Sequence, residues 1–88
     1  MKMIIAIVRD SDDQAVIQQL VNQNYRVTRV ASTGGFLRRG MVTLLIGVES
    51  EKVQAVIDLV RDACRPPAEA NQHRATVFVV NMPHFEQI

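Results

Sequence analysis

An internal repeat is the feature of this chain that most restricts its fold. Laying Ile4–Val21 over Thr43–Val60 superposes several pairs of identical residues. They include Ser11 with Ser50, Leu20 with Leu59, and Val21 with Val60. In each half, a short apolar run precedes a serine and then a stripe of apolar residues at helical spacing. Both halves therefore predict a strand, a capped helix and a further strand.

Four segments have the composition of strands. Two of them, Met3–Val8 and Met41–Val48, are apolar almost throughout, which is typical of strands buried on both faces. In the second predicted strand, the alternation of polar and apolar residues fails at Val30-Ala31 and indicates a bulge. The predicted strands are Met3–Val8, Tyr25 to about Thr33, Met41–Val48 and Ala75–Val80.

Each of the two predicted helices follows a serine. Ser11 and Gln14 have the spacing of a capping box, and Ser50 is expected to cap the second helix. Pro66-Pro67 stop that helix after Cys64. The stripes expected to face the core are Val16, Ile17, Leu20 and Val21 in the first helix, and Val53, Val56, Ile57 and Val60 in the second.

Two interleaved βαβ units predict an α+β fold, the ferredoxin-like split βαβ sandwich (βαββαβ). This fold has a four-stranded antiparallel sheet with both helices on one face. The length of the chain suits a single domain over residues 1–88. Because the first and third strands are apolar on both faces, the face without helices needs a cover. A second copy of the chain is the expected cover, so we predict a homo-oligomer.

Composition excludes several classes of function. The formal net charge is +1, and the basic residues are scattered, which argues against nucleic-acid wrapping driven by bulk charge. Cys64 is the single cysteine, so no internal disulfide is possible and a reducing compartment is expected. The apolar run Met3–Val8 is too short for a signal-peptide core. We therefore expect a cytoplasmic protein with no membrane insertion.

The stretch Arg26–Gly40, RVTRVASTGGFLRRG, has the composition of a phosphate-binding loop. Gly34-Gly35 allow a ligand to approach the backbone, and successive N–H groups in such a turn can form an anion-binding nest. Arg38 and Arg39 can donate bidentate hydrogen bonds to phosphate, and Phe36 offers an apolar plate for a planar base. The alternative is an ordinary hairpin whose glycines form the turn and whose arginines keep it soluble.

Catalytic and metal-binding residues are poorly represented. Both histidines, His73 and His84, lie near the C-terminal end and form no Ser-His-Asp set that the sequence can place together. Cys64 and His73 lack the spacing of a zinc site, and the cysteine is better explained by packing. The acids before the first helix are better explained by capping and by the helix dipole; they are Asp10, Asp12 and Asp13. We therefore expect no enzymatic activity, no metal and no cofactor.

With catalysis and metal binding poorly supported, ligand binding is the remaining class of function. A row of polar residues precedes the glycine loop. Asn24, Arg26 and Thr28 alternate along the second predicted strand, so they are expected to point to one face. A solvated strand face would show the same pattern. Gly47 interrupts an apolar strand, which indicates either a bulge or close approach of another group to the backbone.

The order AIVRD, RVTRVASTGGFLRRG, LLIGVE and ATVFVV resembles the PII-like cyclic di-AMP receptor family. The similarity runs through Met1–Cys64 and resumes at Ala75. The resemblance implies a small, non-enzymatic, trimeric signal transducer that binds the dinucleotide in clefts between neighbouring subunits. It would relay the ligand level to a partner protein that the sequence does not identify.

The resemblance also implies roles for particular residues. Asn24, Arg26 and Thr28 would contact base and phosphate, and Gly47 would leave room opposite them. Three loop residues would wrap the ligand: Gly35, Phe36 and Leu37. The full set of candidate ligand-binding residues is Asn24, Arg26, Thr28, Thr33, Gly34, Gly35, Phe36, Leu37, Arg38 and Gly47.

This chain departs from the family pattern at three places. Met41 replaces a polar Asn, Arg65–His73 is a much shorter connection, and His73-Arg74 replace a Gly-Gly pair. These departures leave open a PII-like trimer that binds another adenine nucleotide or a small anion. A structural or metal-tolerance oligomer without a nucleotide is a further alternative, and it would require His73, His84 and Cys64 to converge.

Overall fold

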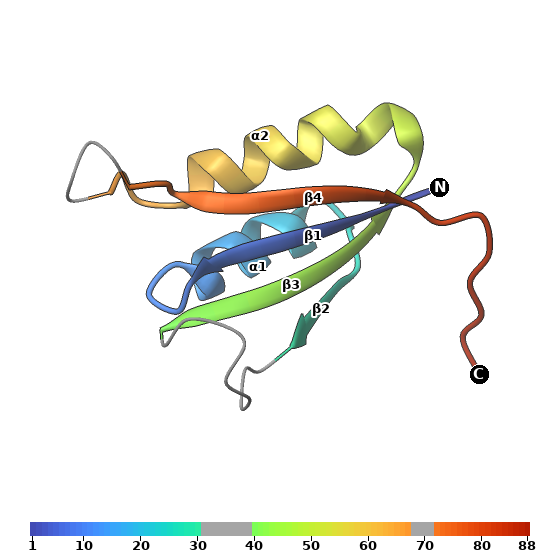
Figure 1. Cartoon of the computed structure of the whole chain (residues 1–88), viewed down its shortest axis with the longest axis horizontal. Coiled ribbons are helices and arrows are strands. Elements are labelled where there is room, and N and C mark those ends of the chain that lie inside the picture. Colours follow the sequence, from blue (N-terminus) through green and yellow to red (C-terminus); the bar gives the residue numbers. More distant parts are fainter. Residues whose placement is uncertain (31–39, 68–71) are drawn as a thin grey trace.

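The strand nearest the N-terminus lies in the middle of the sheet. In the computed structural model, which describes residues 1–30, 40–67 and 72–88, β1 (Lys2–Arg9) lies between β3 (Met41–Val48) and β4 (Ala75–Asn81). β2 (Val27–Val30) lies on the outer side of β3. Each neighbouring pair is antiparallel, which gives the order β2-β3-β1-β4 (Figure 1). The predicted antiparallel sheet is confirmed.

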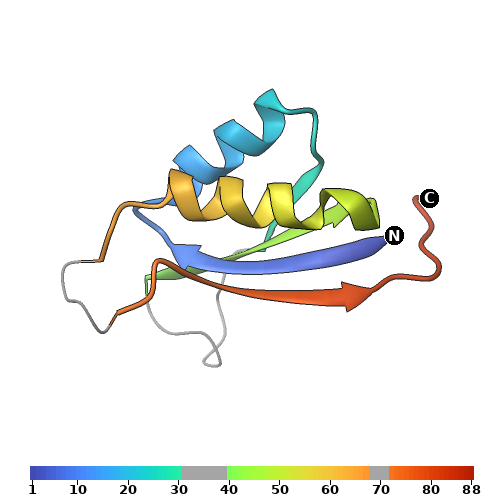
Figure 2. The same ribbon diagram turned by 90° about the horizontal axis from the view of Figure 1, so that it is seen from above.

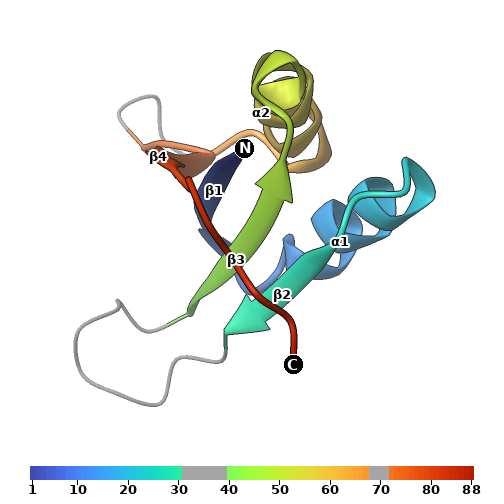
Figure 3. The same cartoon turned by 90° about the vertical axis from the view of Figure 1, so that its right-hand side faces the viewer.

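Both helices cover the same face of this sheet. α1 (Asp13–Asn22) follows β1, and a 3-10 turn at Ser50–Lys52 leads into α2 (Val53–Ala63). The two helices lie together on one side of the strands, and the other side carries no helix (Figures 2 and 3). The ferredoxin-like arrangement expected from the sequence is thus confirmed. Neither helix of the described segments has the length and apolarity needed to cross a bilayer.

The core lies between the helices and the inner face of the sheet. Along β1 and β3, fully buried residues alternate with partly exposed ones, as the two-residue period of a strand requires. α1 and α2 contribute apolar residues spaced four apart. The buried apolar residues are Ile4, Ala6, Val8, Val16, Leu20, Val42, Leu44, Ile46, Val48, Val56, Val60 and Cys64.

The helix starts differ from those that the sequence predicts. α1 begins at Asp13 with Asp12 at the N-cap position, and no side chain caps it, so the capping box of Ser11 and Gln14 is wrong. The side chain of Asp12 instead pairs with Arg9 in the preceding strand. Ser50 does not cap α2 either, because it begins the 3-10 turn and α2 starts only after Lys52.

The second strand starts later than expected. β2 starts at Val27 rather than at Tyr25, because the chain first makes a turn in which Asn24 has a φ of +66°. Its predicted bulge at Val30-Ala31 extends outside the described residues. Val21 was expected to face the core but is exposed, because α1 packs through the narrower stripe that contains Val16 and Leu20.

The face of the sheet opposite the helices is apolar. Ile5 on β1 pairs with Leu45 on one side and Phe78 on the other, so the three side chains share this face. Phe78 is 54% exposed, and Val80 on the same face is 41% exposed. The predicted homo-oligomer, in which a second copy covers this face, remains a prediction.

Candidate ligand-binding site

One end of the sheet and the segment after β4 line an open cavity of about 610 Å³. Four of the residues singled out from the sequence line it: Asn24, Arg26, Thr28 and Gly47. These residues come from the turn after α1, from the edge strand β2 and from the last part of β3. The full lining is Met1, Met3, Asn24, Tyr25, Arg26, Thr28, Leu45, Ile46, Gly47, Met82, Phe85, Glu86 and Gln87.

The three polar residues reach this cavity in a different way from the one predicted. Only Thr28 belongs to β2, where it pairs with Leu45 of β3. Asn24 lies just after α1 in the left-handed region, which Asn tolerates better than most residues. Its backbone N–H donates to the carbonyl of Val21 at 2.9 Å. Asn24 therefore ends the helix as well as lining the cavity, and the three side chains share a cavity without sharing a strand.

Gly47 opens the floor of the cavity. The pairing of β1 with β3 runs without a break from Lys2↔Val48 to Arg9↔Met41, so Gly47 does not mark a bulge. A Cβ atom on Gly47 would lie 3.4 Å from Cε of Met82 and 3.9 Å from Cε of Met1. The absent side chain thus leaves space beside two methionine side chains. Of the two explanations that the sequence offers, close approach of another group is the one that fits.

Arg26 supplies the positive charge of the cavity. Its side chain is exposed, and its Nη1 donates to Oε1 of Gln87 at 2.6 Å. Glu86, next along the chain from Phe85, adds a carboxylate to the same lining. A guanidinium, an amide and a hydroxyl beside apolar side chains are suited to a ligand that is both planar and anionic.

The segment after β4 was not identified from the sequence as part of the candidate site. Met82, Phe85, Glu86 and Gln87 all line the cavity, but this stretch contains Pro83 and has no periodic pattern. The topology could have revealed them. β4 runs antiparallel to β1, so the chain leaves β4 beside Met1, where the N–H of Met82 donates to the carbonyl of Met1 at 3.1 Å.

Of the glycine loop, only its C-terminal end at Gly40 lies within the described residues. The predicted loop residues Thr33, Gly34, Gly35, Phe36, Leu37 and Arg38 lie outside the described residues. At the end of the loop, Gly40 has a φ of +86°, a conformation that favours glycine. Its carbonyl accepts a hydrogen bond from the N–H of Asp10 at 2.7 Å, which ties the start of β3 to the turn after β1.

Asp12 and Asp13, at the start of α1, form ion pairs with arginines instead of capping the helix. Asp12, 2% exposed, accepts from Nε of Arg9 at 3.0 Å and from Nε of Arg65 at 3.4 Å. Asp13 accepts from Nε of Arg29 at 2.7 Å. Their partners come from β1, from the segment after α2 and from β2. The acids therefore hold separate parts of the chain to one turn.

Cys64 and the histidines do not form a metal site in the described residues. Cys64 is buried at the end of α2, and burial, followed by the negative charge of Asp12, raises the pKa of its thiol. His84 lies 3.2 Å from a carboxylate oxygen of Glu86. Within residues 1–30, 40–67 and 72–88, no three His, Cys, Asp or Glu side chains are grouped to hold a metal ion.

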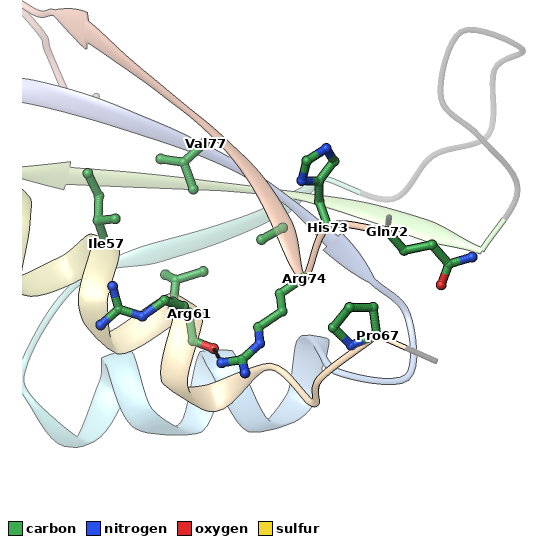
Figure 4. A pocket seen from close by; sticks show the side chains of 9 residues that line it. Ile57, Arg61, Pro67, Gln72, His73, Arg74 and Val77 are labelled. Carbon is green, nitrogen blue, oxygen red and sulfur yellow. Dashed lines mark hydrogen bonds between the residues drawn. The ribbon is translucent and has the colours of Figure 1, made fainter. Parts of the chain in front are cut away.

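A second cavity, of about 400 Å³, lies between α2 and the start of β4 (Figure 4). Ile57, Val60 and Val77 form its apolar part, and Arg61 and Arg74 lie beside them. Both arginines have structural partners. Arg61 pairs with the carboxylates of two neighbouring aspartates, and Nη1 of Arg74 donates to the carbonyl of Arg61 at the end of α2. The cavity next to Gly47 is the better candidate for a ligand site, because four of the residues singled out from the sequence line it.

The sequence and the fold both match known proteins. A protein-family model described as a cyclic-di-AMP receptor matches residues 1–70. A solved structure is described as that of a functionally unknown protein from Pediococcus pentosaceus ATCC 25745, and its chain is 35% identical to this one. The alignment has a TM-score of 0.81 and covers 99% of this chain and 96% of that chain. A receptor family indicates a binding protein rather than an enzyme. The match over residues 1–70, most of the chain, shows that this chain belongs to the cyclic-di-AMP receptor family.

Proposed function

We propose that this protein binds cyclic di-AMP in the cavity lined by Asn24, Arg26, Thr28 and Gly47. The observation that carries the proposal is the position of Gly47. It lies in a regular strand that does not require glycine, and its missing side chain leaves space beside Met82 and Met1 in the cavity that the polar residues also line. Membership of a cyclic-di-AMP receptor family supports this choice of ligand.

Each polar residue has a role that its chemistry suits. Arg26 faces a phosphate of the ligand, because a guanidinium can donate two parallel hydrogen bonds to phosphate oxygens. Asn24 and Thr28 donate to or accept from an adenine edge or a phosphate oxygen. Phe85 and the methionines of the lining provide apolar surface for the adenine rings.

We further propose that the protein is a homotrimer whose ligand lies in clefts between subunits and whose bound state is relayed to a partner protein. The apolar open face of the sheet, with Phe78 and Val80 exposed, supports an assembly that buries it. The glycine loop belongs to the same proposal, in which Gly35, Phe36 and Leu37 wrap the ligand. Light scattering is expected to give three times the mass of one chain.

Calorimetric titration with cyclic di-AMP tests the proposal, with ATP and cyclic di-GMP as competing ligands. We expect micromolar affinity near one ligand per chain, and much weaker binding of the other two nucleotides. Arg26→Gln should weaken binding strongly. The matched control is Arg61→Gln, which removes an exposed arginine on α2 and should leave the affinity unchanged. Equal binding by the Arg26→Gln variant and the wild type would contradict the assigned site.

A further inference from the structure

Asp13 holds the edge strand that carries part of the candidate site. Its Oδ2 atom accepts a hydrogen bond from Nε of Arg29 on β2 at 2.7 Å. The side chain of Asp13 is 4% exposed, whereas that of Arg29 is 43% exposed. Because the acceptor is buried, solvent screens this ion pair less than a pair between two exposed side chains.

β2 has little apolar packing of its own. The four residues of β2 that the structure describes lie at the edge of the sheet, and of these only Val27 is partly buried. Among the described strands, β2 pairs with β3 alone. Short edge strands with few buried contacts open more readily than central strands. The Asp13–Arg29 pair gives β2 a link to α1 in addition to its pairing with β3.

The alternation of side chains along β2 connects this link to the ligand site. Arg29 pairs with Leu44, a core residue, and therefore lies on the helix side of the sheet. Thr28 pairs with Leu45, which lines the cavity, and therefore lies on the opposite side. When Arg29 is held in place, the backbone of Thr28 in the same strand, and of Arg26 directly before it, is held as well.

We propose that Asp13 is a positioning residue for the ligand site, which acts through Arg29 and does not touch the ligand. By holding Arg29, it keeps β2 where Thr28 and Arg26 face the cavity before the ligand arrives. A site organised in advance loses less entropy on binding, so the ion pair contributes to affinity. This inference rests on the proposed function.

The test compares Asp13→Asn, Arg29→Gln and the double variant with the wild type. Arg65→Gln is the matched control, because it takes a guanidinium from Asp12, another buried acid of the same turn, without touching β2. Arg29→Lys keeps the positive charge and serves as the conservative variant. For each protein, calorimetry gives the Kd for cyclic di-AMP, urea unfolding gives the stability, and hydrogen–deuterium exchange of the free protein reports on Val27–Val30.

We expect Asp13→Asn and Arg29→Gln each to raise the Kd about five- to tenfold. The double variant should bind no more weakly than either single variant, because both remove the same link. Amides of β2 should exchange faster, Arg29→Lys should retain most of the affinity, and Arg65→Gln should change the Kd less than about twofold. An unchanged Kd in Arg29→Gln, or an equal loss in Arg65→Gln, would overturn the proposal.

The experiment separates this proposal from the proposed function. If the wild type does not bind cyclic di-AMP, the proposed function is wrong. The exchange rates alone then test the positioning role of Asp13. Faster exchange confined to β2 in Asp13→Asn and Arg29→Gln would support the positioning role. Unchanged exchange in β2 would overturn it. If Asp13→Asn does not fold, Arg29→Gln tests the same link from its exposed end.

Discussion

A Cβ atom placed on Gly47 would lie 3.4 Å from Cε of Met82, an ordinary van der Waals contact. Gly47 pairs in register with Met3, and its backbone does not have the left-handed φ that requires glycine. The fold therefore accepts a small side chain at this position. What a side chain would change is the space beside Met82, inside the candidate ligand cavity.

Gly47→Ala should separate stability from binding. Alanine costs less conformational entropy than glycine within a strand, so stability should stay unchanged or rise by up to about 1 kcal/mol. Affinity for cyclic di-AMP should fall, and Gly47→Val should lower it further, as measured by calorimetry beside thermal unfolding.

Gly40→Ala is the control for the stability part of this prediction, and its effect on stability should be the opposite. Gly40 has a φ of +86° and does not line the cavity, so this variant should lose about 1 kcal/mol of stability. Full-affinity binding by the Gly47→Val variant would contradict the role assigned to this glycine.

Asn24 should show two separable roles. Asn24→Gly keeps a residue that adopts a positive φ easily, so the free energy of unfolding should change little, while the loss of the amide weakens ligand binding. Asn24→Ala should weaken binding and also destabilise the protein by about 1 kcal/mol. Urea unfolding and calorimetry measure both effects. Wild-type affinity in Asn24→Gly would limit this residue to ending the helix.

Asp12→Asn should destabilise the fold more than the same change at an exposed acid. The buried carboxylate of Asp12 accepts hydrogen bonds from Arg9 and Arg65, so losing its charge should cost about 1–2 kcal/mol. Asp62 also pairs with an arginine, but its side chain is 70% exposed, and Asp62→Asn should stay within about 0.5 kcal/mol of wild type. Similar losses in the two variants on urea unfolding would contradict this ranking.

The buried thiol of Cys64 predicts a loss of stability at alkaline pH. Burial raises the pKa of this thiol above that of the unfolded chain, so the unfolded state releases the proton first. The stabilising contribution is fully present below the unfolded pKa of about 8.5 and is lost as the pH rises through the folded pKa. Urea unfolding between neutral pH and pH 10 should show this decline.

Cys64→Ala serves as the control for the alkaline transition. The variant lacks the thiol, so the part of the pH dependence due to Cys64 should disappear from its unfolding curve. The native wild-type thiol should also react slowly with a thiol reagent, because it is buried and protonated. If the free energies of unfolding of the wild type and of Cys64→Ala fell equally with rising pH, the alkaline loss of stability could not be assigned to Cys64.

Most of the fold could be predicted because the apolar pattern is strong where the chain is buried. Met41–Val48 has the predicted bounds, and Cys64 ends the second helix as expected. The helix starts could not be predicted from the local pattern, because the side chain of Asp12 pairs with Arg9 and Arg65 and does not cap the helix backbone. Arg65, one of those arginines, is distant in sequence.

Sequence patterns identified only part of the candidate site, because the position of its other residues depends on contacts remote in sequence. Asn24, Arg26, Thr28 and Gly47 were recognised from short stretches and do line one cavity. Phe85 and its neighbours were missed because their place depends on where β4 ends against β1, which is a property of the whole sheet. The ion pairs of Asp12 with Arg65 and of Asp13 with Arg29 were not predicted, because these arginines lie 53 and 16 positions away in the sequence.

The position of β1 has a consequence for synthesis of the protein. β1 leaves the ribosome well before β4, one of its two neighbours in the sheet, although Lys2 pairs with Asn81. A nascent chain that has not yet made β4 also lacks the wall of the cavity formed by Met82 and Phe85. A ligand bound there would therefore stabilise finished chains over incomplete ones.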